Sequence, residues 1–445
     1  MIEIMALLSN IRQAVTVTEF RQLRVIVAAV LAMTGPVTML NIVRWTGKGG
    51  SYPTVRRFYQ ASIIWLKVNW ALSREQLQAV GGIFLLVGDE TVTTKSGKAT
   101  YGVERFFSSI YKRPVSGLAF FGVSLVSVEE QQSTLMLMEQ LKKAESTSAQ
   151  SRPAAAKPKG AKPTTPHPKA KGGRPKGGKN KNRRDIELPA YLQNLQGYFQ
   201  QVLAVVGDKL SIPYCLLDGA FGNNHALQMV RRLGLHLISK LAKNSALYFP
   251  YTGEQKKCGN RRKYGTQLDY QNIPERYLTK RLIEEGVRTE IYQMALWSKC
   301  FPDLLNLVVI VKTKLSTQQR AHVVLFSSDQ ALEADKLILY YRLRFQIEFN
   351  FRDAKQYWGL EDFMNVNQRQ VYNAANFALF MTNLAGWLVR QRRTSRPAFS
   401  VNDLKAEFRG RFYALETLKL FPDSPDPSFI DRLFDRFSSI GAVNG

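Results

Sequence analysis

The sequence predicts an α/β protein in which a central sheet is interrupted by a β-rich insertion and flanked by helical regions at both ends. Three observations predict this class. Two buried strand-like runs, residues 83–88 and 211–217, are each followed directly by an aspartate. Strand-like runs recur within residues 245–333, and helical periodicity dominates both ends of the chain. With 445 residues, of which 45% are hydrophobic, the chain can build two or three domains.

Composition limits the kind of partner and the compartment. The formal charge of +27 indicates a polyanionic partner, because so much like charge repels itself unless phosphates neutralise it. Cys215, Cys258 and Cys300 form no C-x-x-C pair, so neither a disulfide framework nor a structural zinc site is expected. The apolar run 25–33 is too short to cross a membrane. We therefore expect a cytoplasmic protein with no membrane partner.

Residues 1–78 are expected to be helical and to bind DNA. Two helical runs are followed by a glycine-rich turn, residues 46–50, and by a third helix for which Ser51 is a good N-cap. This order is similar to a helix-turn-helix, with Arg56 and Arg57 as DNA contacts on the third helix. The alternative is an ordinary helical bundle with a solvated arginine pair.

Residues 79–145 are expected to begin the sheet. The continuous apolar run 83–88 is typical of a buried central strand, and it ends at Asp89. Asp89 is therefore the first candidate metal ligand, at the tip of its strand. Because side chains alternate along a strand, Glu90 would point to the opposite face and is the weaker candidate.

Residues 146–187 are expected to form a disordered basic linker. The stretch 146–184 contains no acidic residue and twelve Lys and Arg, and it has too few apolar residues to bury a core. Within it, residues 173–177 resemble the core of an AT-hook, in which Arg174 and Lys176 would enter the narrow minor groove. The alternative is a solvated linker that contacts phosphates without specificity.

Residues 188–244 are expected to continue the sheet. A second apolar strand ends on Asp218, and a short helix and another strand, which ends near Lys240 and Lys243, follow it. Strand, helix, strand is the βαβ pattern, which places Asp218 at the carboxyl edge of the sheet, where α/β proteins keep their sites. Asp218 is the second candidate ligand, and the two lysines are candidate DNA contacts. For each aspartate the alternative is a turn former or helix cap.

The segment 245–333 is expected to be a β-rich insertion. Its strand-like runs are residues 288–296, 305–311 and 321–326. A basic patch that includes Arg261 and Arg262 is a candidate DNA contact, and a solvated loop is the alternative.

Residues 335–360 predict one long buried helix. At about 100° per residue, Tyr341, Arg344, Glu348 and Lys355 fall within roughly 60° of one another on its surface. Four polar groups on a buried helix are costly unless they bind something. The alternative is an intrahelical salt bridge between Arg344 and Glu348. Residues 366–445 are expected to add a helical C-terminal region.

The spacing of Tyr341, Arg344, Glu348 and Lys355 resembles the Y-R-E-K signature of bacterial insertion-sequence transposases of the insertion-sequence-four superfamily. The resemblance implies an RNase H-like core, built from residues 79–145, 188–244 and 334–365 and interrupted by the β-rich insertion. It also implies a nucleoid-associated bacterial protein that forms a homodimer in the synaptic complex.

In that family, a DDE triad holds two divalent metal ions, and here the triad would be Asp89, Asp218 and Glu348. Tyr341, Arg344 and Lys355 would contact phosphates near the cut end, and excision would pass through a hairpin intermediate. Three carboxylates suit two Mg²⁺ ions that serve an in-line displacement. Oxygen ligands favour Mg²⁺, or Mn²⁺ in its place, over zinc.

The leading hypothesis is therefore a transposase that binds transposon ends, hydrolyses phosphodiester bonds and transfers the 3′-hydroxyl ends to double-stranded target DNA. The alternatives are a metal-dependent nuclease on the same fold and a noncatalytic DNA-binding regulator.

Overall fold

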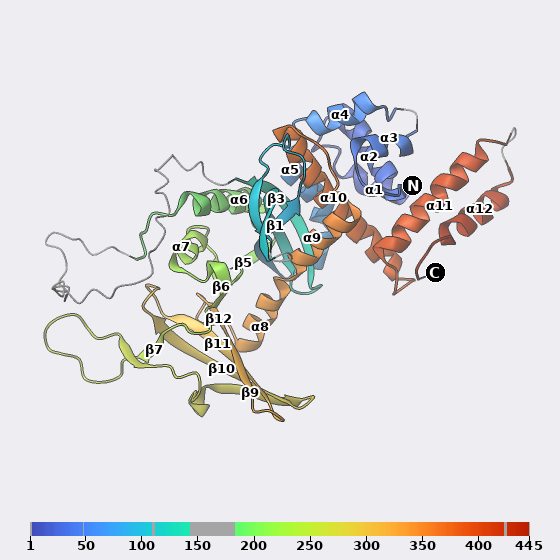
Figure 1. Cartoon of the computed structure of the whole chain (residues 1–445). Helices are drawn as coiled ribbons and strands as arrows, with labels where there is room; N and C mark the ends of the chain where they lie inside the picture. Colours follow the sequence, from blue (N-terminus) through green and yellow to red (C-terminus); the bar gives the residue numbers. More distant parts are fainter. Residues whose placement is uncertain (1, 48, 109–111, 143–182, 422–424, 445) are drawn as a thin grey trace, which may run out of the picture.

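The computed structural model describes residues 2–47, 49–108, 112–142, 183–421 and 425–444, and it contains one large mixed sheet with helices packed on it (Figure 1). Five strands in the spatial order β4-β3-β1-β5-β6 form its central part. β3 is antiparallel to both of its neighbours, whereas β1, β5 and β6 run parallel to one another. This mixed α/β arrangement is compatible with an RNase H-like core. The bounds are β1 Ile83–Thr94, β2 Glu104–Ser108, β3 Arg113–Ser127, β4 Gln132–Leu141, β5 Ser211–Leu216 and β6 His236–Leu241.

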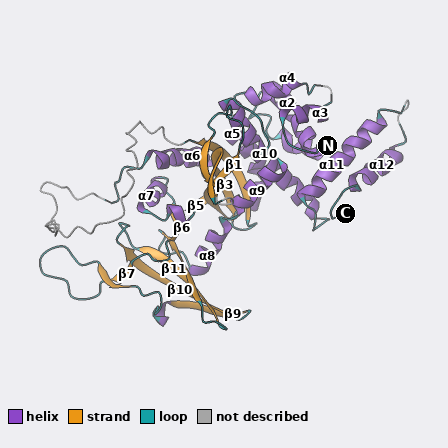
Figure 2. Ribbon diagram, viewed as in Figure 1, coloured by secondary structure: helices purple, strands orange, loops and turns teal. Residues whose placement is uncertain are grey.

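The strands after residue 245 extend this same sheet. β12 pairs antiparallel with β6, and β11 and β10 follow it outward, so the sheet continues from the core into the β-rich segment. The strands predicted at residues 288–296, 305–311 and 321–326 are present as β10, β11 and β12. Figure 2 shows this segment apart from most of the helices. The bounds are β7 Leu247–Pro250, β8 Tyr264–Gln267, β9 Leu278–Glu284, β10 Val287–Ser298, β11 Leu305–Lys314 and β12 Arg320–Ser327.

The two faces of the central sheet are covered by different helices. At Gly122 of β3, a Cβ atom would lie 2.6 Å from the ring of Phe351 on α9 (Gln346–Tyr357), so only glycine lets this helix approach so closely. The preceding residue, Phe121, points the other way and packs edge to face on Phe199 of α6 (Ala190–Val206). α9 and α6 therefore lie on opposite faces of the sheet. α7 (Asn224–Arg232) follows β5 and packs on α6.

The outer edge of β4 is closed by two asparagines of α10 (Gln368–Arg393). The Asn376 amide donates to the Met138 carbonyl oxygen at 2.9 Å and accepts from the Met138 N–H at 3.1 Å. Asn383, seven residues further along the helix, makes the same pair of bonds to Leu135. Both asparagines are buried, so they satisfy strand edge groups that water cannot reach.

The N-terminal helices pack on the C-terminal ones. Phe58 of α4 contacts Phe377 of α10 edge to face, and the Trp65 indole donates to Asn373 at 2.8 Å. The three helices expected before residue 61 are present as α2, α3 and α4, and Arg56 and Arg57 are exposed on α4. The bounds are α1 Ile2–Ser9, α2 Val17–Ala32, α3 Met39–Trp45, α4 Tyr52–Gln60, α5 Trp65–Val80, α11 Val401–Leu418 and α12 Pro427–Ser439.

The single helix predicted over residues 335–360 is wrong, because the chain forms two helices there. α8 (Ala334–Leu343) packs beside β12 and β6, whereas α9 packs on β1, β3 and β4 (Figure 1). Between them, the N–H groups of Arg344 and Phe345 bond to carbonyls three residues back instead of four. A twisted sheet explains the break, since one straight helix cannot follow strands so far apart in it. Phe345, in this turn, is 46% exposed.

The expected basic linker falls largely on residues 143–182, which lie outside the described residues, as do Arg174 and Lys176. In the described parts of the chain, no helix is both long and apolar enough to cross a membrane.

Candidate active site at the carboxyl edge of the sheet

Asp89 lies within β1, and the prediction that it ends the strand is wrong. β1 continues to Thr94 because β3 pairs with it as far as Gly117. On its other side, the parallel pairing with β5 stops at Val87 and Leu216. Asp89 therefore lies just beyond the end of the parallel pair, so it is at a carboxyl edge of the sheet although its own strand does not stop there.

Asp89 and Glu90 point to opposite faces of the sheet. Asp89 is paired with Gly122, whose open side faces α9, and the Asp89 carboxylate is bonded to Arg344 in the turn just before that helix. Glu90 accepts a hydrogen bond from the Tyr191 hydroxyl on α6. The carboxylate of Asp89, not that of Glu90, thus shares a face with Glu348.

Asp218 follows β5 by two residues and begins the short 3-10 turn Gly219–Phe221. Its Oδ1 accepts from the Ala220 N–H at 3.0 Å, which is the local capping role expected of a turn aspartate. Among the described residues, its other oxygen accepts no hydrogen bond and is available for a second role. Asp218 and Asp89 line the same open cavity of about 440 Å³, together with Glu90, Tyr191 and Phe221.

Arg344 joins two of the predicted ligands. Its Nη1 donates to Asp89 Oδ2 and its Nη2 donates to Glu348 Oε1, both at 2.7 Å. The salt bridge between Arg344 and Glu348 that was the alternative is therefore present, but Arg344 lies in the turn before α9 and also bonds Asp89 of β1. The Arg344 side chain is only 8% exposed, whereas that of Glu348 is 42% exposed. The Nε of Arg344 is buried without a hydrogen-bond partner among the described residues.

The charges in this site affect one another. Burial raises the pKa of Asp89 to about 6, and this outweighs the lowering by the Arg344 guanidinium. The negative charges of Glu348 and Asp218 also raise the pKa of Asp89, so all three carboxylates interact electrostatically. Burial likewise raises the pKa of the Tyr341 hydroxyl, which lies near Arg344 and near the charges of Asp218 and Asp89. Arg344 thus links Glu348 to Asp89, and the Tyr341 hydroxyl lies near this pair.

Lys355 lies further along α9 and contacts β1 beyond Asp89. Its Nζ donates to the Val92 carbonyl oxygen at 2.7 Å and is 3.5 Å from a Glu361 carboxylate oxygen. Burial lowers the pKa of Lys355, and Glu361 opposes that shift. Lys355 is therefore on the same side of the sheet as Glu348, but it is held by the strand and by Glu361.

The other predicted DNA contacts are spread over the molecule. Lys240 of β6 is near Asp218, since a Cβ atom on the next residue, Gly219, would lie 3.2 Å from the Lys240 Cε. Lys243 follows β6 and is exposed. Arg261 and Arg262 are exposed in the β-rich segment, and Arg56 and Arg57 are on the helical side of the molecule. These four arginines are not brought to the carboxylates.

Sequence reasoning missed several residues that line the cavity beside Asp89 and Asp218. Tyr191, Phe221 and His225 all lie there. His225 could have been found from its position, because it is in the first turn of the helix that follows Asp218 and that turn faces the same edge of the sheet. Tyr191 carries no such signal, since its place depends on how α6 crosses the sheet.

The carboxylates supply the donor type that divalent cations such as Mg²⁺ prefer. Within the described residues, no three His, Cys, Asp or Glu side chains converge closely enough to hold a metal ion as they stand. The guanidinium of Arg344 instead lies between Asp89 and Glu348, where it neutralises them. The residues fit a metal site in chemistry and location, and Arg344 must move for Asp89 and Glu348 to share an ion.

The chain matches the family model described as DDE superfamily endonuclease over residues 10–300. It belongs to this family. The match includes Asp89 and Asp218 and ends before Glu348. DDE membership supports a metal-dependent nuclease or transposase-like enzyme whose substrate is DNA. No curated protein matches the chain.

Proposed function

We propose that this DDE enzyme is a cut-and-paste transposase of the insertion-sequence-four type. It binds the ends of an insertion sequence, hydrolyses phosphodiester bonds and transfers the 3′-hydroxyl ends to double-stranded target DNA. The observation that carries the proposal is that Arg344 bonds both Asp89 and Glu348 at the edge of the sheet where Asp89 and Asp218 line one cavity. The Y-R-E-K spacing around Glu348 supports the transposase over other DDE enzymes.

Asp89, Asp218 and Glu348 would hold two Mg²⁺ ions, for which Mn²⁺ can substitute. Bound ions of this kind activate the attacking oxygen and stabilise the leaving oxygen of an in-line displacement. The cavity beside Asp89 and Asp218 leaves room for the scissile phosphate, and the 42% exposure of Glu348 lets its side chain turn toward the aspartates.

In this proposal, Arg344 releases the carboxylates of Asp89 and Glu348 and binds a phosphate of the DNA instead. A carboxylate paired with guanidinium is a poorer metal ligand, so metal binding favours release of Arg344. Its planar fork matches phosphate oxygens, and the buried Nε still needs an acceptor. Tyr341 and Lys355 contact neighbouring phosphates.

The basic residues outside the site would bind the rest of the DNA. Lys240 and Lys243 extend from the triad along β6, and Arg261 and Arg262 lie further out in the β-rich segment. Arg56 and Arg57 on α4, together with Arg174 and Lys176, would contact the transposon end. Two copies of the chain would pair the two ends in a homodimeric synaptic complex.

A cleavage assay on end-labelled DNA with Mg²⁺ tests the proposal. Joined products are expected. Cut products alone would instead support the second candidate, a nuclease without strand transfer, which the endonuclease family favours. Absence of both products, with DNA binding retained, would identify a noncatalytic regulator.

A further inference from the structure

A second hollow lies in the β-rich segment, well away from the carboxylates. It has a volume of about 660 Å³ and is formed by the ends of β7 and β8, the loop between them and the turn at Arg276. Six inter-strand steps separate β1 from β7 in the sheet. At about 4.8 Å per step, the hollow is roughly 29 Å from Asp89.

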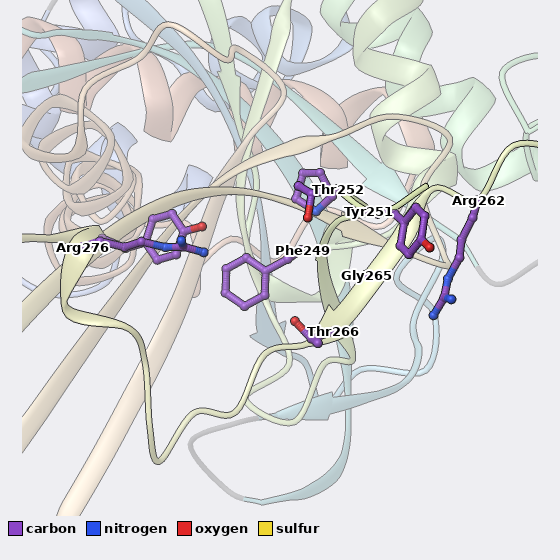
Figure 3. A pocket seen from close by; sticks show the side chains of 10 residues that line it. Phe249, Tyr251, Thr252, Arg262, Gly265, Thr266 and Arg276 are labelled. Atoms are coloured by element: carbon purple, nitrogen blue, oxygen red, sulfur yellow. The ribbon is translucent and has the colours of Figure 1, made fainter. Parts of the chain in front are cut away.

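The walls of the hollow combine flat rings with guanidinium groups. Figure 3 shows Arg262 beside Tyr251 on one side, Phe249 in the middle and Arg276 on the far side. The Arg262 guanidinium carbon is 4.5 Å from the centre of the Tyr251 ring. Arg276 lies in the same way over Tyr277, at 4.9 Å. Each arginine is thereby held at the rim of the hollow, and N–H groups of its guanidinium remain available to a ligand.

The floor and the remaining walls are small and neutral. Phe249 and Tyr277 stack on each other, with their ring centroids 5.4 Å apart and 20° between their planes, and form an apolar part of the wall. Gly265 leaves room at the floor, and Thr266 presents a hydroxyl. No carboxylate is among the described residues that line the hollow. A ligand with a flat ring and a negative group matches these walls.

We infer that this hollow binds an unpaired nucleotide of single-stranded DNA, with the base against the aromatic rings that line the hollow and the flanking phosphates at Arg262 and Arg276. This rests on the proposed function, which supplies DNA as the substrate. Bases in a duplex hide their faces in the stack, so only an unpaired strand can use the rings. The separation from Asp89 means that the nucleotide held here is not the one at the cleavage site.

The test measures binding without cleavage, in the full chain carrying Glu348→Ala and with EDTA present. The probe is a labelled oligothymidine of about 12 nucleotides, and the comparison is a duplex of the same length. Tyr251→Ala with Tyr277→Ala should raise the Kd for the single strand about tenfold and leave the Kd for the duplex nearly unchanged. Tyr251→Phe with Tyr277→Phe keeps the rings and should bind as the parent does.

The arginines are tested by salt dependence. Arg262→Gln with Arg276→Gln should lower the slope of log affinity against log salt for the single strand by about 1.4, that is, about 0.7 for each phosphate contact. Lys312 is an exposed charge on β11 outside the hollow, so Lys312→Ala is the control for a general loss of charge. It should lower the slope by less than half of the decrease in the double arginine variant. If the chain with Tyr251→Ala and Tyr277→Ala does not fold, the double arginine variant still tests the inference.

An equal loss of single-strand and duplex affinity in the tyrosine variant would overturn the inference, because the hollow would then contact only backbone. Unchanged single-strand affinity in both the tyrosine and the arginine variants would also overturn it. If the chain cuts no DNA but binds oligothymidine through the tyrosines, the inference stands and the proposed function fails.

Discussion

Two arginines of this molecule each bridge two carboxylates, one from a buried position and the other from an exposed position. Arg344 joins Asp89 and Glu348, and its side chain is 8% exposed. Arg281 of β9 joins Glu275 and Glu290 in the β-rich segment, and its side chain is 46% exposed. The exposed bridge is screened by water and fixes local structure at most weakly. The buried one lies beside the cavity that Asp89 and Asp218 line, and the proposed function assigns the reactive site to that place.

The carboxylates test this difference most strongly. Asp89→Ala, Asp218→Ala and Glu348→Ala should each lower DNA cleavage on the order of a thousandfold or more, because ligands of shared metal ions act as one unit. DNA binding, measured by anisotropy, should stay nearly intact. Glu275→Ala removes a carboxylate from the exposed bridge and is the matched control, for which cleavage should be retained.

Two results would contradict this prediction. If Glu90→Ala abolishes cleavage while Asp89→Ala does not, the metal site faces α6 instead of α9. If Glu275→Ala is as damaging as Glu348→Ala, burial does not separate the two bridges.

The bridging arginines give the next largest effect. Arg344→Lys should lower cleavage about a hundredfold, because lysine keeps the charge but loses the fork that contacts phosphate. Arg281→Lys, the same change in the exposed bridge, should leave cleavage close to wild type. Calorimetry on the DNA complex should find Mg²⁺ affinity unchanged in Arg344→Lys. Loss or tightening of Mg²⁺ binding in Arg344→Ala would assign the arginine to the metal site instead of the phosphate.

The sequence predicts most of this arrangement where the signal is local. Apolar runs located β1 and β5, and period-2 alternation predicted that Asp89 and Glu90 would face opposite ways. Helical spacing placed Arg344 near Glu348. Each of these depends on a few neighbouring residues and on backbone geometry alone.

The failures all depend on tertiary pairing. β1 runs past Asp89 because β3 continues beside it, and no pattern within residues 83–94 shows where a partner strand stops. The helix breaks at Arg344 because its two halves pack on different strands. The bond from Arg344 to Asp89 spans 255 positions in the chain, and it could not be predicted until the sheet was known.

Glu139 gives the smallest effect and shows what burial does to a carboxylate whose hydrogen-bond partner is not an arginine. It lies near the end of β4, and burial raises its pKa to about 7, although a hydrogen bond from the Tyr372 hydroxyl lowers it somewhat. Since the folded pKa is above the unfolded value of 4.5, the folded state binds more protons in between. The stability that this bound proton contributes is therefore fully present below about pH 4.5, and it is lost as the pH rises toward about 7.

Glu139→Gln cannot ionise, so it should remove this part of the pH dependence. In urea titrations, the free energy of unfolding of the variant, relative to that of wild type, should rise by roughly 2 kcal/mol between about pH 5 and about pH 8. This figure allows for solvent screening at a partly buried site. Wild type should lose stability over that range because the buried carboxylate must ionise without a guanidinium to compensate it. If the difference in free energy of unfolding between the two proteins is the same at both pH values, Glu139 is already ionised in the folded state at the lower pH. Burial alone would then not explain the raised pKa of Asp89 either, and the contrast between the buried and exposed bridges would need another cause.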